Sequence, residues 1–424
     1  MKKIVSAYNS VGLIWRIIIG IVIGTLLGVF APKDMAVVEL LGTLFVSALK
    51  AVAPVLVFFL VISALANAKA AGSMKTVVIL YIISTLAAAL VAVGASFLFP
   101  IDITLANADA VENTPPKDIG EVLTKLLTSI FSNPITSLST PDYLGILAWA
   151  IVLGLALRAA SAHTKTIFAD VAQAVTKVVG WVINCAPFGI LGLVYTAVAE
   201  SGLDIFTTYG KLLVLLVCCM FFICLVINPL IVAVCIHRNP YPLVLRCMRD
   251  SGVYAFFTRS SAANIPVNMG LCEKLGLNKD NYSVSIPLGA TINMAGASVT
   301  ISVMTLATVH LLNIPVDFPT ALILSVLAAV GACGASGVAG GSLLLIPMAC
   351  SLFGISNDIA MQVVAVGLII GVIQDSCETA LNSLSDVVFT ATAEYRERRL
   401  KGIDFTPGAD APCPDATEEA KEQA

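Results

Sequence analysis

Charged side chains are scarce in this chain of 424 residues, because aspartate, glutamate, lysine and arginine together make up only 12% of it. Soluble globular domains carry roughly 25%. The scarcity excludes a disordered chain, a nucleic-acid-binding protein with a basic surface and an ordinary cytosolic enzyme. The formal net charge of -3 says little about binding partners.

Motifs for metal binding and for disulfide formation are also missing. The 11 cysteines include no Cys-x-x-Cys pair, and the 3 histidines are far apart in the sequence. This pattern gives no support for a disulfide framework or a zinc site. We expect most of the cysteines to be small packing residues inside apolar segments.

Long apolar runs fill most of the chain, which is 58% hydrophobic with a mean hydropathy of +0.95. A membrane-spanning helix needs roughly 20 such residues. The runs predict six ordinary spans, near residues 12–30, 41–67, 76–99, 142–160, 166–199 and 207–236. The first run resembles a signal peptide but lacks a clear cleavage site, so we expect a retained helix. Basic and acidic loops alternate, which predicts a multi-pass membrane protein with both termini in the cytoplasm.

Two later apolar stretches, 243–269 and 321–353, are interrupted at their centres, at 258–266 and 334–342, by polar and helix-breaking residues. Each flank has about a dozen residues, which reaches only about halfway through the hydrocarbon. We interpret both as re-entrant helical hairpins, each followed by a further span. An odd number of crossings separates them, so they enter from opposite faces as inverted repeats. This arrangement is typical of transporters that bind substrate at the bilayer midplane.

The last span carries an unusual polar face. Asp375, Thr379, Asn382 and Asp386 lie within about 40° of one another on a helix, and Glu378 lies roughly 60° to one side. Each carboxylate costs about 2.5 to 3.5 kcal/mol at the bilayer centre unless positive charge compensates it. Arg259 is the only basic residue in the interrupted segments nearby, so a substrate amino group, a metal ion or protons would have to supply the rest. The alternative is that some carboxylates lie at the cytoplasmic helix end and reach water.

Two further patterns suggest ligand contacts. Ser260 and Ser261 stand where two short helices meet, where backbone N–H groups and hydroxyls can receive a carboxylate, although they could equally cap a solvated loop. Glycines flank Asn293 in the segment 289–296, and an unwound backbone there would offer carbonyl oxygens to sodium. The glycine-rich run 334–341 lacks the Gly-Lys-Ser of a phosphate loop, so we do not expect nucleotide binding.

At these residues the sequence resembles the dicarboxylate/amino acid:cation symporter family, which includes archaeal aspartate and mammalian glutamate transporters. The similarity covers about residues 12–393 and rests on Thr258-Arg259-Ser260-Ser261, Asn293-Met294-x-Gly296 and the segment 375–386. The string 252–264 is most similar to the bacterial sodium-coupled serine/threonine branch of the family.

The resemblance implies an all-α membrane protein of eight transmembrane helices and two re-entrant hairpins that works as an elevator-type homotrimer. A scaffold would comprise residues 1–75 and 141–200. The mobile transport domain would comprise residues 76–99, 205–236, 241–270 (first hairpin), 281–312, 320–353 (second hairpin) and 356–393. Residues 100–140 would form an extracytoplasmic loop and residues 394–424 a charged cytoplasmic tail.

The resemblance also implies the site residues. Substrate would contact the hairpin tips and the last span at Ser260, Ser261, Val338, Ser342, Asp375, Thr379 and Asn382. Asp375, helped by Thr379, would hold its amino group, and the region 338–342 would close the site as the outer gate. Sodium, the expected coupling ion, would bind at Gly289, Asn293, Asn382 and Asp386, with a possible second ion near Thr291 and Met294. No other cofactor and no nucleic-acid partner is expected, and lipid surrounds the protein.

Three positions bear on specificity and coupling. Members with acidic substrates carry arginine where this chain has Glu378, and aspartate where it has Ala295. Glu378, together with Arg259, therefore predicts a small neutral amino acid such as serine or threonine, and Ala295 predicts one fewer sodium site. The alternatives are a sodium-coupled transporter of another small amino acid or a carboxylate, and a channel on the same fold. An intramembrane aspartyl protease is disfavoured, because Asp375 and Asp386 would lie about 16 Å apart along one helix.

Overall fold

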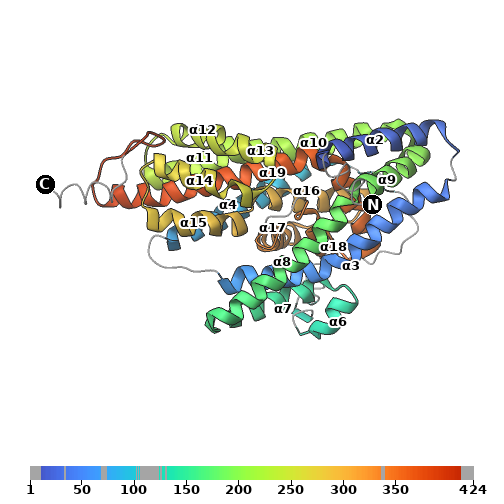
Figure 1. Ribbon diagram of the computed structural model, residues 1–424, viewed down its shortest axis with the longest axis horizontal. Helices are drawn as coiled ribbons and strands as arrows, with labels where there is room; N and C mark the ends of the chain where they lie inside the picture. Colours follow the sequence, from blue (N-terminus) through green and yellow to red (C-terminus); the bar gives the residue numbers. More distant parts are fainter. Residues whose placement is uncertain are drawn as a thin grey trace.

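The computed structural model describes residues 11–32, 35–67, 74–101, 103, 105, 124, 127–128, 131–335 and 340–411. Every regular element in these ranges is helical. The helices run mainly along the long axis of an elongated molecule (Figure 1). This all-helical architecture agrees with the fold class that the sequence predicts.

Seven helical stretches in the described ranges are long and apolar enough to cross a membrane. They are α2 (Leu13–Phe30), α3 (Ala36–Asn67), α4 (Met74–Leu98), α8 (Ala162–Asn184), the run Ala186–Ile236, the run Lys279–Leu311 and α19 (Asn357–Leu400). Side chains on their outer faces, such as Leu44 and Val214, are apolar and exposed. The chain is therefore an integral membrane protein.

Two of the predicted spans differ in the structure. The span expected at 142–160 is α7 (Tyr143–Ala156), which has 14 residues before a 3-10 turn, η2 (Leu157–Ala159), and is short for a full crossing. It follows a short helix, α6 (Pro134–Ser139). The span expected at 166–199 is two helices, α8 and α9 (Ala186–Ser201), which meet at Cys185 and lie end to end in Figure 1. Pro187 lies in the first turn of α9 and lacks the N–H that a continuous helix would use there.

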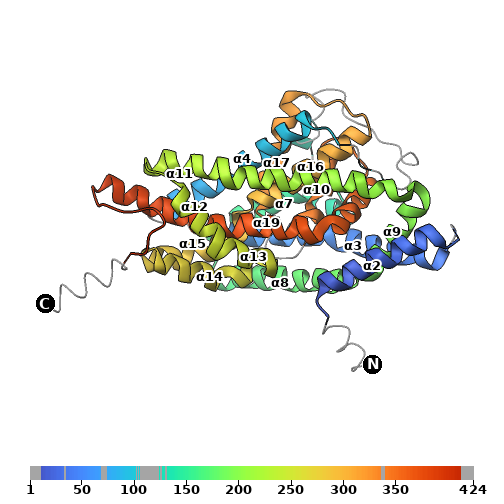
Figure 2. The same ribbon diagram turned by 90° about the horizontal axis from the view of Figure 1, so that it is seen from above.

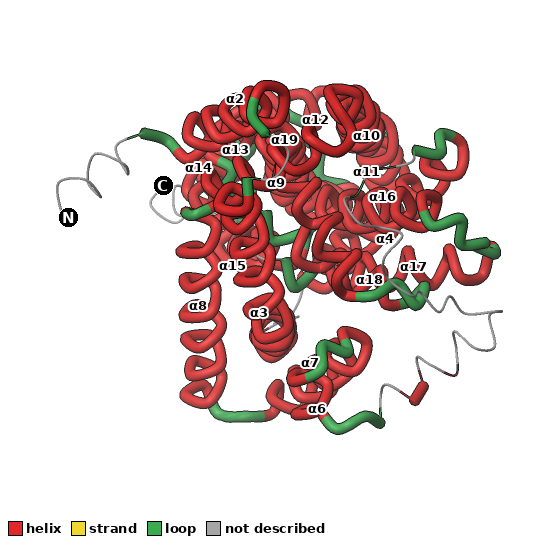
Figure 3. The backbone as a smooth tube through the Cα atoms, turned by 90° about the vertical axis from the view of Figure 1, so that its right-hand side faces the viewer, coloured by secondary structure: helices red, strands yellow, loops and turns green. Residues whose placement is uncertain are grey.

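The first group of helices packs through small residues. The helices α2 and α3 contact α9, and α3 also contacts α7 and α8. A side chain at Gly20 would lie 2.4 Å from the carbonyl oxygen of Pro187, and one at Gly24 would lie 2.5 Å from that of Leu191. Only glycine permits this backbone approach, which is how helices associate closely in lipid. Figure 3 shows α6 and α7 at the edge of this group, beside α3.

The second group surrounds α19. It contains α4 and a broken run of α10 (Ile205–Phe222), the π-helical turn η4 (Ile223–Ile227) and α11 (Asn228–Ile236). A 3-10 turn, η3 (Gly202–Asp204), connects α9 to α10. The helices α10 and α11 pack directly on α19, and Figure 2 shows them running alongside it.

The first helical hairpin comprises α12 (Tyr241–Cys247), the π-helical turn η5 (Met248–Gly252) and α13 (Val253–Thr258), followed by α14 (Ser261–Lys274). The predicted interruption of 258–266 is only two residues long. Arg259 takes a left-handed conformation with φ 51° that ends α13, and the Ser260 side chain caps α14. Pro266 lies inside α14, so the proline does not mark the break.

The second hairpin comprises α17 (Phe318–Ala332), the 3-10 turn η6 (Leu343–Leu345) and α18 (Ile346–Ser351), and residues 336–339 of its tip lie outside the described ranges. Between the hairpins, α15 (Lys279–Ile292) and α16 (Ala295–Leu311) are separated by a break at Asn293 and Met294. This is the unwound segment that the flanking glycines predict. By contrast, α19 is unbroken over its 44 residues.

The segment after α19 folds back over the base of the first hairpin. Arg238 donates to the Asp404 carboxylate at 2.6 Å, and this hydrogen bond lowers the pKa of Asp404 below its usual range. Phe405 is buried and stacks on Tyr395 with ring centroids 4.9 Å apart. Arg246 donates to the Gly408 carbonyl at 2.8 Å. These contacts tie the end of α19 to α11 and to the first hairpin.

Candidate functional site

The polar face of α19 lies inside the protein. Asp375 is 3% exposed and Asp386 is 1% exposed, and Glu378, Thr379 and Asn382 are also buried. The helix continues 14 residues past Asp386 to Leu400. The alternative that Asp375 or Asp386 reaches water at a helix end is therefore wrong, and the cost of burying these carboxylates must be met locally.

Asp375 lies where the two hairpin tips meet. Arg259 Nε donates to Asp375 Oδ2 at 2.7 Å, and the backbone N–H of Gly340 donates to Oδ1 at 3.1 Å. Arg259 also reaches the Gly371 carbonyl at 3.4 Å. From the sequence, Arg259 is the only basic residue nearby, and we expected a ligand to neutralise the negative charge of Asp375. In the structure the arginine itself supplies the positive charge.

Glu378 lies in a ring of hydrogen-bond donors. Its Oε2 accepts from Thr300 Oγ1 at 2.7 Å, Ser342 Oγ at 2.8 Å and Gln374 Nε2 at 2.6 Å. Three donors therefore converge on this single oxygen. Thr300 and Gln374 were not predicted from the sequence, although Gln374 lies one helical turn before Glu378 on the same face. Ser342, expected at the substrate, donates to Glu378 in this structure.

Asn382 connects α19 to the break between α15 and α16. The backbone N–H of Gly296 donates to Asn382 Oδ1 at 2.7 Å, and Asn382 Nδ2 contacts the Met294 sulfur at 3.3 Å. A side chain at Gly296 would lie 2.9 Å from the backbone of Glu378. Glycine therefore allows the start of α16 to touch α19. Because sulfur is a weak acceptor, the Asn382 amide is free to exchange this contact for a stronger acceptor.

An oxygen-rich cluster lies one turn further along α19. Asn293 Nδ2 donates to Ser385 Oγ at 2.8 Å and to Asp386 Oδ1 at 2.9 Å, and it lies 3.3 Å from the Asn382 carbonyl oxygen. Asp386 Oδ2 and Asn293 Oδ1 are buried without a hydrogen-bond partner among the described residues. Rotation of the amide would turn Asn293 Oδ1 toward the other oxygens, as amide orientation is assigned from its neighbours. Such a set suits a hard cation.

The described residues contain no cluster of three or more His, Cys, Asp or Glu side chains. A transition-metal centre therefore has no ligand set in this part of the chain. The cluster around Asp386 instead combines one carboxylate with amide, hydroxyl and carbonyl oxygens, which is the mixture that a weakly bound monovalent cation would meet.

Tyr81 covers this cluster from α4. Its hydroxyl donates to the Ser285 carbonyl at 3.2 Å and lies 3.3 Å from the Asp386 carbonyl oxygen. The neighbouring hydroxyls point elsewhere, because Ser84 donates to Asn228 at 3.0 Å and Thr85 donates to the Tyr81 carbonyl at 2.8 Å.

The remaining predicted residues are placed as follows. Ser260 Oγ accepts from the Ala263 N–H at 3.2 Å, and Ser261 is buried in the first turn of α14. Thr291 Oγ1 donates to the Leu288 carbonyl at 2.7 Å, at the end of α15. Val338 lies outside the described ranges. The serine hydroxyl at the hairpin tip is thus a helix cap, with the N–H groups of α14 directed toward the tip.

A buried polar network fixes the first hairpin on α19. Asn264 Nδ2 donates to Ser383 Oγ at 2.6 Å, and Asn268 Nδ2 donates to the Ser383 carbonyl at 2.9 Å. Ser251 Oγ donates to Asn268 Oδ1 at 2.5 Å. Ser383 follows Asn382 in the chain, so the network sets the register between the hairpin tip and the polar face of α19. None of these residues was singled out from the sequence.

Comparison with known proteins gives a consistent result. A sequence model of the sodium:dicarboxylate symporter family matches residues 13–395. The serine/threonine transporter SstT of Streptococcus agalactiae serotype Ia is 58% identical over 396 residues, which cover 93% of this chain and 98% of the relative. The protein of the same name from Streptococcus thermophilus is 56% identical over the same lengths.

Gly289 lies so close to Asp386 that a larger residue at this position tests the cation site. A side chain at Gly289 would lie 2.4 Å from Asp386 Oδ1 and 2.8 Å from the Tyr81 hydroxyl. Gly289→Ala should displace the carboxylate, cost about 1 to 3 kcal/mol of stability and abolish any rise in Tm on adding sodium. Thermal unfolding in sodium and in choline measures both effects. Gly270→Ala is the control, because its added methyl meets nothing within 4 Å. An unchanged sodium-dependent Tm in Gly289→Ala contradicts a cation site at Asp386.

Proposed function

The chain belongs to the sodium:dicarboxylate symporter family, and we propose that it uses a sodium gradient to import serine and threonine. Close relatives of nearly the same length are serine/threonine transporters. Serine and threonine transport is accordingly the function of this membrane protein. The sodium coupling, the site residues and the movement of the protein are further parts of this proposal.

The main support is that three carboxylates are buried on the polar face of α19 between residues 375 and 386 beside a single guanidinium. Glu394, a further buried carboxylate near the end of α19, has its own partner in Arg398. Asp375, Glu378 and Asp386 are buried, and Arg259 pairs with only one of them. Buried charges are unfavourable unless they are paired. A sodium ion and the amino group of a substrate are two cations that would complete the balance, so each would bind better in the presence of the other.

The substrate site that we propose lies between the hairpin tips. The ammonium group of serine would replace Arg259 at Asp375, with Thr379 beside it on the same face of α19. The substrate carboxylate would face the amino-terminal end of α14 at Ser260 and Ser261, where unpaired N–H groups attract anions. Asn382 Nδ2 would exchange its sulfur contact for this carboxylate. The region 338–342 would then close over the substrate.

Glu378 would set the specificity together with Arg259. A glutamate at this position provides no cation for the side-chain carboxylate of aspartate or glutamate as substrate. A hydroxyl group, by contrast, can donate a hydrogen bond to Glu378, which already accepts hydrogen bonds from the hydroxyls of Thr300 and Ser342. The side-chain hydroxyl shared by serine and threonine fits this requirement.

We place the coupling sodium among Gly289, Asn293, Asn382 and Asp386. Backbone, amide and carboxylate oxygens converge there, and two of those oxygens lack a partner among the described residues. A second sodium would lie at the helix break near Thr291 and Met294, under the second hairpin. Sodium would neutralise Asp386 and hold the break in its loaded conformation.

For the movement we propose an elevator in a homotrimer. The group formed by α2, α3, α7, α8 and α9 would be the scaffold, and the group around α19 with both hairpins would be the transport domain. The packing of the helices into these two groups supports the division. The orientation that we propose is an inner-membrane protein with both termini in the cytoplasm. A channel on the same fold is the competing function.

Sodium-driven accumulation of serine separates the two functions. One sodium per zwitterion carries one net charge, worth about 2.3 kcal/mol per 100 mV. A tenfold sodium gradient adds about 1.4 kcal/mol. At about 100 mV the two contributions together limit the accumulation of serine to some 500-fold. Uptake of labelled serine into proteoliposomes with an imposed sodium gradient measures it. A channel would stop at equilibrium, and uptake that persists when choline replaces sodium would disprove the coupling.

Asp375→Asn should abolish serine transport, with a loss of at least about 100-fold, because a neutral amide cannot balance the substrate ammonium in an apolar site. The variant should remain folded by size-exclusion chromatography. Asp280→Asn, an exposed aspartate at the start of α15, is the control and should transport normally. Normal serine uptake by Asp375→Asn would show that the ammonium binds elsewhere.

The coupling number follows from Ala295, which is buried beside Asn293. An aspartate there would add a hard anionic oxygen, and hard cations need several such oxygens to replace their water. We expect one sodium per serine, or two if the site near Thr291 also fills. Reversal potentials of serine flux in proteoliposomes determine the ratio, and a value matching three sodium ions would refute the argument from Ala295.

A further inference from the structure

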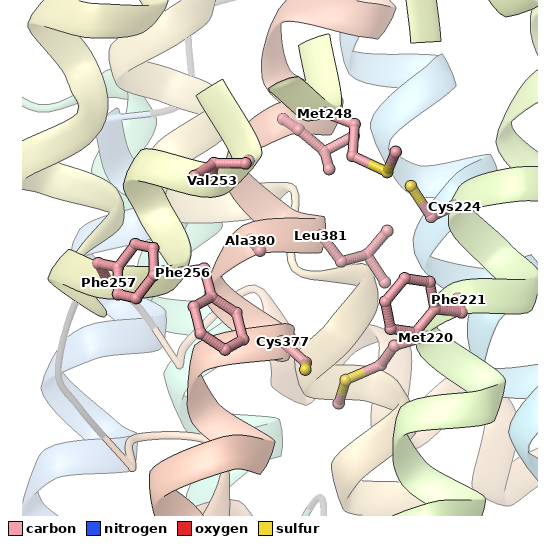
Figure 4. Close-up of a pocket in the computed structure, with 12 residues that line it drawn as sticks. Met220, Phe221, Cys224, Met248, Val253, Phe256, Phe257, Cys377, Ala380 and Leu381 are labelled. Carbon is pink, nitrogen blue, oxygen red and sulfur yellow. The ribbon is translucent and has the colours of Figure 1, made fainter. Parts of the chain in front are cut away.

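An apolar groove of about 330 Å³ lies on the side of α19 that faces away from the polar residues. Its floor is formed by Cys377, Ala380, Leu381 and Leu384 of α19, and its walls come from α10 with η4 and from η5 with α13. Figure 4 shows the side chains of Phe256, Leu381 and Phe221 gathered around the space between these helices. Every residue that lines the groove is apolar or glycine.

Two π-helical turns stand on opposite walls of the groove. Cys224 lies in η4 on one wall, and Met248 and Gly252 lie in η5 on the other. A π-turn widens a helix by one residue and is frequent at functional sites. A side chain at Gly252 would lie 3.0 Å from Leu384, so glycine brings η5 close to α19 and leaves the space beyond it open.

The groove opens toward the surroundings of the protein. Phe257 is 74% exposed at its rim, and Val253 and Phe221 are about half exposed. Aromatic and aliphatic side chains on the flank of membrane-spanning helices face hydrocarbon. The occupant of the groove therefore has to be apolar and to reach it from the bilayer.

One end of the groove carries an exposed guanidinium. Arg249 follows Met248 in η5, and its side chain is 75% exposed. It donates Nε and Nη2 to Asp250 at 2.6 Å and 3.1 Å, and a guanidinium has further N–H groups for a second acceptor. Asp250 also pairs with Arg246. From Met248 to Phe257 the groove wall is about 13 Å long, with the guanidinium at one end and apolar side chains along the rest.

We propose that this groove binds one acyl chain of an anionic phospholipid, whose net negative headgroup lies at Arg249. The volume of the groove lies within the range of small-molecule sites, about 300 to 1,000 Å³. Basic residues beside spanning helices bind anionic lipid headgroups on the cytoplasmic side. Placing Arg249 on that side rests on the proposed orientation, whereas the acyl-chain contact does not.

The bound chain would support the site from behind. At about 100° per residue, Cys377, Ala380 and Leu384 point away from Asp375, Thr379 and Asn382 on the same helix. The chain would also contact Phe256, three residues before Arg259. Filling the groove therefore fixes the hairpin tip and α19 relative to each other, and it makes transport depend on the lipid composition.

Photo-cross-linking of the whole protein in vesicles tests the proposal. The probes are phosphatidylglycerol and phosphatidylcholine with the same diazirine-labelled acyl chain, and labelled peptides are mapped by mass spectrometry. We expect labelling concentrated in segments 220–224, 248–257 and 377–384. Arg249→Gln should reduce labelling by the anionic lipid about fivefold and leave the zwitterionic lipid unchanged. Arg396→Gln, an exposed arginine outside the groove, is the matched control.

A second variant tests the chain contact alone. Ala380→Leu fills the groove and should reduce labelling by both lipids, whereas Val234→Phe adds bulk on the exposed outer face of α11 and should not. Equal labelling of other outward-facing segments, such as 79–83, would overturn the proposal. So would labelling that Ala380→Leu leaves unchanged, or cross-links from the groove to a second copy of the chain. None of these readouts requires transport.

Discussion

The burial of three carboxylates within the segment 375–386 of α19 is the constraint on which the rest of the structure depends. Charges in a low-dielectric interior are unstable unless partners surround them. Arg259, the Gly340 N–H and the donors around Glu378 supply part of that compensation. The oxygens left without partners near Asp386 show where it is incomplete. In the function that we propose, sodium and the substrate ammonium would bring the missing charge.

Broken helices supply the polar groups that a membrane lacks. A continuous helix satisfies its own backbone, so it offers ligands only side chains. The breaks at Arg259, at Asn293 and before Leu343 bring N–H groups and carbonyl oxygens to the middle of the protein. The helix α19 is continuous and contributes mainly side chains, together with the carbonyl oxygens of Gly371, Asn382 and Ser383. Glycines at 289 and 296 allow the broken segments to approach it closely.

One side of α19 is polar and the other is apolar, and each side contacts different parts of the protein. The polar side meets the hairpin tips, and the apolar side forms the floor of the groove between η4 and η5. The network of Asn264, Asn268 and Ser383 holds the first hairpin against the helix between these two sides. The segment 401–411 adds a tie at the base of that hairpin. Packing of this kind would allow the group around α19 to move as one body in the elevator that we propose.

The sequence by itself determined the membrane class, the polar face of α19 and the breaks near residues 259 and 293, because hydropathy, helical period and glycine placement are local properties of the chain. It also determined the family through its motifs. Only the tertiary structure decided that Arg259 pairs with Asp375, that Gln374 and Thr300 surround Glu378, and that the span expected at 166–199 divides at Cys185. The pairs Arg259–Asp375 and Thr300–Glu378 are 116 and 78 positions apart. They depend on which helices meet, and contacts over such separations leave no periodic signal in a single sequence.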